Sequence, residues 1–199
     1  MDIYLAEVMG RKKVIDREKT MQAIETVVRQ HGLAGLTIDA VAKEAGISKS
    51  SVLYDFSSKN ALLAAFLRSR METKRAAIAD ACAQGGWSED AWLKGLLDHI
   101  QTAPSEEDMA IAMIVAAGTG SSDECRKIFT ETVSEDMAKV AGQSARPRAA
   151  MLAYLAAYGL MSMEYFGFHS FPPAQRNQIL QDIGWLMTAS PSDTTPPTS

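Results

Sequence analysis

Apolar positions recur every three or four residues along most of the chain, as at Met21, Ile24 and Val28. This spacing places apolar side chains on one face of a helix, and no segment shows the sustained alternation that predicts a strand. Capping residues, glycines and prolines divide the pattern into separate helices. The sequence therefore predicts an all-α fold with nine helices, at residues 16–31, 37–44, 48–54, 59–84, 88–101, 105–117, 122–141, 146–168 and 173–188.

Glycine and proline positions mark the predicted helix ends. Gly32, Gly46 and the turn at 118–120 are expected to stop helices, because glycine adopts the left-handed conformation that ends a helix at little cost. Pro147 suits a first helical turn, where its missing N–H would have no partner in any case. The segment from Ser190, SPSDTTPPTS, is rich in Pro, Ser and Thr and is expected to be a disordered tail.

The composition allows a substantial core, since 47% of the 199 residues are hydrophobic. The longest apolar stretch, 149–163, is shorter than the roughly 20 residues that a bilayer span needs. The acidic residues Asp2 and Glu7 precede the first basic run, which is the reverse of the order in a signal peptide. We therefore expect no membrane helix and a cytoplasmic location.

Charge is distributed unevenly between the two ends of the chain. Residues 1–75 hold 13 basic and 9 acidic residues, whereas residues 76–199 hold 7 basic and 15 acidic residues. A basic head on an acidic body is typical of a modular DNA-binding protein. The run Arg11-Lys12-Lys13 lies in a segment, 1–14, that we expect to be a flexible basic arm reaching DNA. The alternative is a solvated charge run beside an extended start, with Met9 as the initiator.

The segment 37–63 has the pattern of a helix-turn-helix. Two short predicted helices are joined by Ala45-Gly46-Ile47, in which Gly46 can end the first helix. Val52 and Phe56 lie four residues apart and are expected to pack inward together with Val41 and Leu62. The opposite face would present a lysine, two hydroxyls and a tyrosine to the major groove, at Lys49, Ser50, Ser51 and Tyr54.

Residues 18–67 resemble the head of the TetR family of transcriptional regulators. The matching positions are Gly32, Thr37, Val41, Ala42, Ala45, Gly46, Ile47, Ser48, Lys49, Phe56, Ser58, Lys59, Leu62 and Leu63. The resemblance implies that the chain binds a double-stranded DNA operator. By position, it implies phosphate contacts from Thr37, Ser48, Tyr54 and Lys59, and base contacts from Lys49, Ser50 and Ser51.

The recognition helix departs from the family pattern at one position. Residues 52–56 follow a subgroup that reads Leu-Leu-Tyr-His-Phe, but Asp55 replaces the histidine. A carboxylate there would repel a DNA phosphate unless it paired with a basic residue such as Lys59 or served as a helix cap. A phosphate contact at position 55 is therefore not expected.

The body after residue 75 holds 10 of the 14 aromatic residues and most of the methionines. Methionine adapts to irregular neighbours and aromatic rings offer flat surfaces, so this mixture suits a cavity for an apolar or aromatic effector. An ordinary core is the alternative. An acidic body containing Glu164 further favours cationic molecules. The candidate ligand-binding residues are Trp92, Met109, Met113, Phe129, Tyr158, Met161, Glu164 and Tyr165.

The last two predicted helices carry small residues at helical spacing, which allows close packing. Their sequence also resembles the closing helix pair of the same TetR subgroup, and this implies a twofold homodimer with a four-helix interface. Packing within one chain is the alternative. The candidate interface residues are Ala149, Ala153, Ala156, Leu160, Ile179 and Ile183.

These observations predict a DNA-binding domain at 15–60 and a regulatory and dimerisation domain at 61–189. No phosphate-binding loop, nucleophile elbow or metal-ligand cluster occurs, and Cys82 and Cys125 are far apart, so we predict no catalytic residue, metal or cofactor. The predicted function is a homodimeric repressor on a palindromic operator, released by a small-molecule effector. The alternative is a helical carrier or interaction protein that no longer binds DNA.

Overall fold

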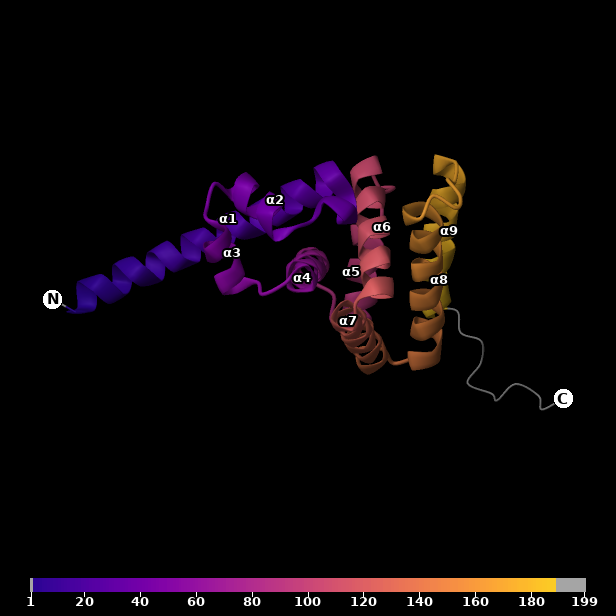
Figure 1. Ribbon diagram of the computed structural model, residues 1–199. Helices are drawn as coiled ribbons and strands as arrows, with labels where there is room; N and C mark the ends of the chain where they lie inside the picture. The colour runs from indigo at the N-terminus through magenta and orange to yellow at the C-terminus, as the bar shows by residue number, and fades with distance from the viewer. Residues whose placement is uncertain (1, 189–199) are drawn as a thin grey trace. The chain divides into compact units, whose positions relative to one another are not determined.

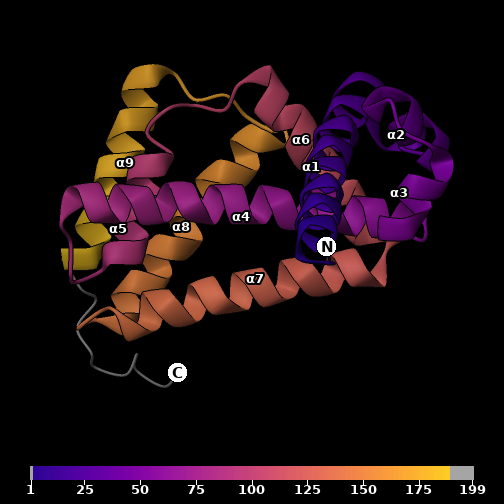
Figure 2. The ribbon, with the colours of Figure 1, turned by 90° about the vertical axis from the view of Figure 1, so that its left-hand side faces the viewer.

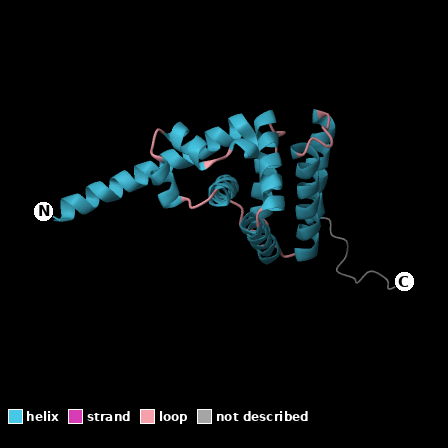
Figure 3. Ribbon diagram, viewed as in Figure 1, coloured by secondary structure: helices cyan, strands magenta, loops and turns pink. Residues whose placement is uncertain are grey.

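The computed structural model describes the backbone of residues 2–188 and the side chains of residues 17–188. Within that part of the chain it contains nine helices and no strand (Figure 3). The all-α prediction is confirmed. No helix among the described residues is long and apolar enough to span a bilayer.

The helices follow one another through short connections. Their bounds are α1 Asp2–Gly35, α2 Ile38–Ala45, α3 Lys49–Asp55, α4 Lys59–Gly85, α5 Ala91–His99, α6 Glu106–Ser121, α7 Asp123–Gly142, α8 Pro147–Tyr165 and α9 Pro173–Thr188.

The first of two compact units contains the chain up to Arg70 together with Met113–Phe129. Helices α2 and α3 pack against α1 in this unit (Figure 1). Their apolar faces meet in a core in which several side chains are completely buried. This core includes Ile24, Val28, Leu36, Val41, Val52 and Leu62.

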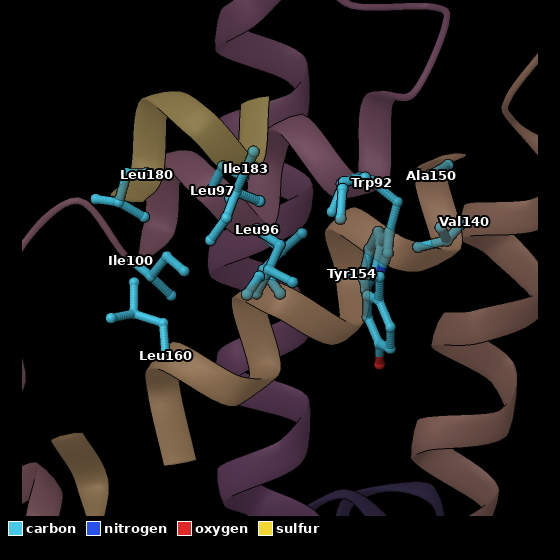
Figure 4. Close-up of a cluster of buried hydrophobic side chains, with 14 residues drawn as sticks. Trp92, Leu96, Leu97, Ile100, Val140, Ala150, Tyr154, Leu160, Leu180 and Ile183 are labelled. Carbon is cyan, nitrogen blue, oxygen red and sulfur yellow. The ribbon is translucent and has the colours of Figure 1, made fainter. Parts of the chain in front are cut away.

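The second unit contains Met71–Ala112 and the chain from Thr130 onward. Helices α5, α8 and α9 pack against one another, and α5 also lies close to the C-terminal half of α4 (Figure 2). Gly95 permits this approach, because a β-carbon there would lie 2.7 Å from the carbonyl oxygen of Ile78. Buried residues from α5, α8 and α9 form the core (Figure 4), among them Trp92, Leu96, Ile100, Tyr154, Leu160 and Ile183.

One of two glycine-based helix ends differs from the prediction. Gly32 interrupts the helix as expected, with the non-helical values φ 63° and ψ −168°, and α1 resumes after this kink as far as Gly35. The predicted stop at 118–120 is wrong, because α6 runs through to Ser121. Gly118 is buried in this helix, and a β-carbon there would lie 3.1 Å from the Leu63 side chain. Close packing rather than a turn accounts for glycine at this position.

The bounds of α1 and α4 can be compared with the predicted arm and the predicted domain boundary. Helix α1 starts at Asp2, so the backbone of the predicted arm is helical, and the expected start at residue 16 is wrong. The side chains of Arg11-Lys12-Lys13 and the tail from Ser190 lie outside the described residues. Helix α4 passes without interruption through the predicted domain boundary at residues 60 and 61.

A buried ion pair joins three helices of the second unit. The guanidinium of Arg176 on α9 donates to both carboxylate oxygens of Glu164 on α8, with Nε 2.8 Å from Oε1 and Nη2 3.2 Å from Oε2. It also donates to the carbonyl oxygens of Ile100 (2.7 Å) and Gln101 (2.6 Å), just after α5. Arg176 thus satisfies a buried carboxylate and the carbonyl groups at the end of a helix together.

This arrangement predicts a large loss of stability in Arg176→Met, because the variant leaves Glu164 buried without a counter-charge. We expect the free energy of unfolding in urea to fall by about 3–5 kcal/mol. The double variant Glu164→Met with Arg176→Met should lose less than Arg176→Met alone. Arg68→Met, which breaks an exposed ion pair with Glu124, is the control and should cost less than about 1 kcal/mol. Equal losses in Arg176→Met and Arg68→Met would contradict this account.

Candidate nucleic-acid interface

The turn between α2 and α3 has the geometry that the sequence predicts. Gly46 adopts a left-handed conformation (φ 64°, ψ 33°), and its N–H points to the carbonyl oxygens of Ala42 and Lys43. The N–H of Ile47 donates to the Ala42 oxygen at 3.1 Å. These bonds satisfy the end of α2 and fix the direction in which α3 begins.

The inward face of α3 is also as predicted. Val52 is completely buried and Phe56 is 4% exposed, and both join the core with Val41 and Leu62. Burial of this face leaves the opposite face of α3 in solvent. Leu53 and Tyr54 are 43% and 75% exposed, respectively.

Hydroxyl side chains cap the helices that border this face. Thr37 accepts a hydrogen bond from the N–H of Ala40 (3.1 Å), and Ser48 accepts one from the N–H of Ser51 (3.1 Å). The Thr37 hydroxyl keeps its own hydrogen, which could be donated to a DNA phosphate. The Ser48 Oγ atom lies 2.8 Å from the Oγ atoms of both Ser50 and Ser51. The three predicted serines therefore form one cluster of hydroxyls.

Lys49 forms an ion pair that the sequence analysis missed. Its Nζ atom lies 2.9 Å from Oδ1 and 3.0 Å from Oδ2 of Asp39, in the first turn of α2. Both side chains are more than half exposed. Lys49 is the first residue of α3, where the helix dipole disfavours a positive charge, and Asp39 offsets that cost. Asp39 therefore shares the exposed face with the predicted base reader.

Asp55 ends α3, and its side chain is half-buried. No ion pair between Asp55 and Lys59 occurs in the described part of the chain. Lys59 is the first residue of α4 and is exposed. Lys59 therefore remains available to a phosphate. The carboxylate of Asp55 would still repel a phosphate placed beside it, as the sequence indicated.

Comparisons with known proteins agree with this geometry. Residues 21–66 match the model described as bacterial regulatory proteins, tetR family, and residues 86–187 match the tetracyclin repressor-like C-terminal domain. The chain belongs to the TetR family. No curated protein matches the chain.

Solved structures share the fold of this TetR family member. A transcriptional regulator from Rhodococcus sp. Rha1 has a TM-score of 0.68 at 21% identity, covering 90% of this chain and 98% of its own. A TetR transcription regulator from Haloarcula marismortui has a TM-score of 0.67 at 19% identity, covering 87% and 96%. The multidrug binding protein EbrR, complexed with malachite green, has a TM-score of 0.67 at 20% identity, covering 85% and 96%.

The predicted ligand-binding residues belong to both compact units. Met113 and Phe129 belong to the first unit, whereas the other six belong to the second. Trp92 is a core residue, 6% exposed, with Nζ of Lys139 3.8 Å above its ring. The remaining partly buried candidates are Met109, Tyr158, Met161 and Tyr165.

Glu164 does not supply the free negative charge that the sequence analysis assigned to it. Its carboxylate is 6% exposed and is neutralised by Arg176. Asp136, another buried acid of this unit, is paired with Arg75 at 2.8 Å. The expectation of a cationic ligand therefore loses its main support, because the sequence could not show that Glu164 and Asp136 are paired with arginines.

The predicted dimer residues lie mainly inside the protomer. Four of them are at most 5% exposed in the protomer and offer almost no surface to a second subunit: Ala149, Ala153, Leu160 and Ile183. Ala156 and Ile179 are half-buried. The small residues of α8 instead let α5 and α9 approach it. A different stripe of α8 faces solvent, formed by Leu152, Leu155, Gly159 and Met163.

The ion pair between Asp39 and Lys49 predicts opposite effects of removing its two members. Asp39→Ala should raise the affinity for non-specific DNA and steepen its salt dependence by about one unit, because Lys49 gains freedom to meet a phosphate. Lys49→Ala should lower that affinity. Asp80→Ala, an exposed acid of the second unit, is the control for net charge. Fluorescence anisotropy over a salt series measures these effects, and weaker binding by Asp39→Ala would show that Asp39 does not oppose DNA binding.

Proposed function

We propose that this TetR family member is a DNA-binding repressor released from its operator by a small molecule. The observation that carries the proposal is the exposed face of the helix-turn-helix, on which α3 carries Lys49, Ser50 and Ser51 in its first turn and Tyr54 near its end. Hydroxyls and an ammonium group match the acceptors and donors of the major groove. Thr37, Ser48 and Lys59 are the proposed phosphate contacts that set its position.

The proposed operator is palindromic because the proposed repressor is a homodimer. A twofold dimer would place two recognition helices in successive major grooves, about 34–36 Å apart. The exposed stripe Leu152, Leu155, Gly159 and Met163 supports dimerisation, since its residues follow helical spacing and present apolar area to solvent. Trp185 on α9 is 62% exposed and adds to the apolar surface of this helix pair.

The proposed effector binds the second unit and favours a conformation that fits the operator poorly. Coupling of about 1–3 kcal/mol between the two sites would change operator affinity roughly 5- to 150-fold. The fold shared with EbrR, a multidrug binding protein solved with malachite green, supports a ligand-responsive body. Apolar or aromatic molecules suit the methionine and tyrosine side chains of α8.

A carrier or interaction protein without DNA binding is the second candidate. Asp55 favours it, because the carboxylate stands where the proposed Leu-Leu-Tyr-His-Phe subgroup has histidine. A selection from random DNA separates the two functions. Enrichment of a palindrome supports the repressor, and failure to enrich any sequence supports the carrier.

The role of Lys59 gives a direct test of DNA binding. Lys59→Ala should weaken binding to every sequence and reduce the slope of log affinity against log salt by about one unit, since one phosphate contact is lost. Lys94→Ala, in the second unit, is the matched control and should leave the slope unchanged. Identical slopes for wild type and Lys59→Ala would remove Lys59 from the interface.

The exposed stripe of α8 gives a test of assembly. Wild type should sediment at twice 21.6 kDa, and Leu155→Asp should sediment as a monomer, because the interface would bury an unpaired charge. Met113→Asp changes an exposed apolar residue of the first unit and should remain dimeric. Circular dichroism checks that both variants stay folded. A monomeric wild type would exclude the twofold repressor.

A further inference from the structure

Two buried acids of the second unit are neutralised by arginines, whereas a third, Asp90 at the start of α5, is buried with its Oδ1 atom unpaired among the described residues. Glu164 pairs with Arg176, and Asp136 accepts from both Nε (3.1 Å) and Nη2 (2.8 Å) of Arg75. Neither carboxylate is free to attract a cation. The pairing of Glu164 and Asp136 therefore removes these two acids as a reason to expect a cationic ligand.

Tyr154 on α8 has an unpaired polar atom in the core. The residue is 2% exposed, and its hydroxyl forms no hydrogen bond with any described residue. Figure 4 shows this hydroxyl pointing away from the labelled apolar side chains that surround the ring. Burial, and then the neighbouring hydroxyl of Tyr158, raise the pKa of Tyr154 above its ordinary value. The phenol therefore stays protonated and can donate its hydrogen to a bound acceptor.

A lysine lies close to the same pair of tyrosines. The rings of Tyr154 and Tyr158 are 4.6 Å apart, and Nζ of Lys74 on α4 lies 3.4 Å from the Tyr158 hydroxyl and 4.8 Å from its ring centre. Among the described residues no carboxylate forms an ion pair with Lys74. We call Lys74, Tyr154 and Tyr158 the donor group.

The surroundings of the donor group are mostly apolar. Tyr158, Met137 and Met161 pack against the core cluster that contains Tyr154. Burial, and then the positive charge of Lys74, lower the pKa of His99, while Asp98 and Asp108 act in the opposite direction. His99 is therefore neutral at pH 7 and adds no positive charge of its own beside Lys74.

We propose that the effector is an organic carboxylate with an apolar acyl or aryl tail, and that its head group binds the donor group. A carboxylate offers two acceptor oxygens and a negative charge, which an ammonium group and two phenol hydroxyls complement. The apolar neighbours suit the tail. This inference rests on the proposed ligand-responsive function, and it replaces the cationic preference expected from composition.

The test compares ligands that share a tail and differ only in the head group. Isothermal titration of the full chain with octanoate, octanol and octylammonium should show octanoate binding at least about tenfold more tightly than octanol, and octylammonium most weakly. Benzoate and benzyl alcohol repeat the comparison with an aryl tail. Equal affinities across the three head groups, or tightest binding of octylammonium, would overturn the proposal.

Two variants of the donor group sharpen the test. Lys74→Met should remove the preference for octanoate and leave octanol affinity unchanged, whereas Lys94→Met, elsewhere in the unit, should change neither. Tyr154→Phe should raise the melting temperature of the free protein, since it removes an unpaired buried hydroxyl, and should weaken octanoate binding. A lowered melting temperature with unchanged octanoate binding would give Tyr154 a structural role only, with an ordered water as its partner.

The same ligands separate this inference from the proposed function. If the chain selects no DNA sequence but binds octanoate through Lys74, the repressor fails and the donor group stands. If the chain binds a palindrome and octanoate neither binds nor releases it, the repressor stands and the carboxylate effector is rejected.

Discussion

Helix α8 is apolar around most of its circumference. The packing of the second unit depends on which side of α8 is buried in the core and which side faces solvent. One side carries Ala150, Ala153, Ala157 and Leu160, which are buried against α5 and α9. Small residues on this side allow the helices to approach closely, so the core fills with Trp92, Leu96 and Tyr154. The other side exposes Leu152, Leu155 and Met163, which only a further surface could cover. One helix thus supplies both the core and the proposed subunit contact.

Buried polar groups fix the orientation of the helices that pack through these apolar contacts. The pair between Glu164 and Arg176 fixes α9 against α8, and the same guanidinium holds the carbonyl groups that follow α5. Such a pair contributes less net stability than its short distances suggest, because both charges lose their hydration. The pair instead favours one orientation of α9, the one in which every nitrogen of the Arg176 guanidinium donates to an acceptor. The Tyr154 hydroxyl and the Oδ1 atom of Asp90 are the exceptions among the described residues, since neither has a hydrogen-bond partner.

The head uses polar groups differently, since they must serve both the fold and an external partner. Thr37 and Ser48 satisfy N–H groups at helix starts and still carry hydroxyl hydrogens on the exposed face. Lys49 is held by Asp39 in solvent, where an ion pair contributes little to stability. The main effect of the pair would be on DNA binding. Asp39 lowers the positive charge of the exposed face and restricts the movement of the Lys49 side chain.

Local chemistry allowed the sequence to determine the helices, the turn at Gly46 and the inward face of α3, because caps, glycine and apolar spacing act within a few residues. It also carried the TetR resemblance, which the family comparisons support. Only the tertiary structure decided which side of α8 is buried, why Gly118 lies within a helix, and that Glu164, Asp136 and Lys49 have partners. Those outcomes depend on residues 10 to 61 positions apart along the chain, and periodicity cannot show which of two apolar sides faces the core.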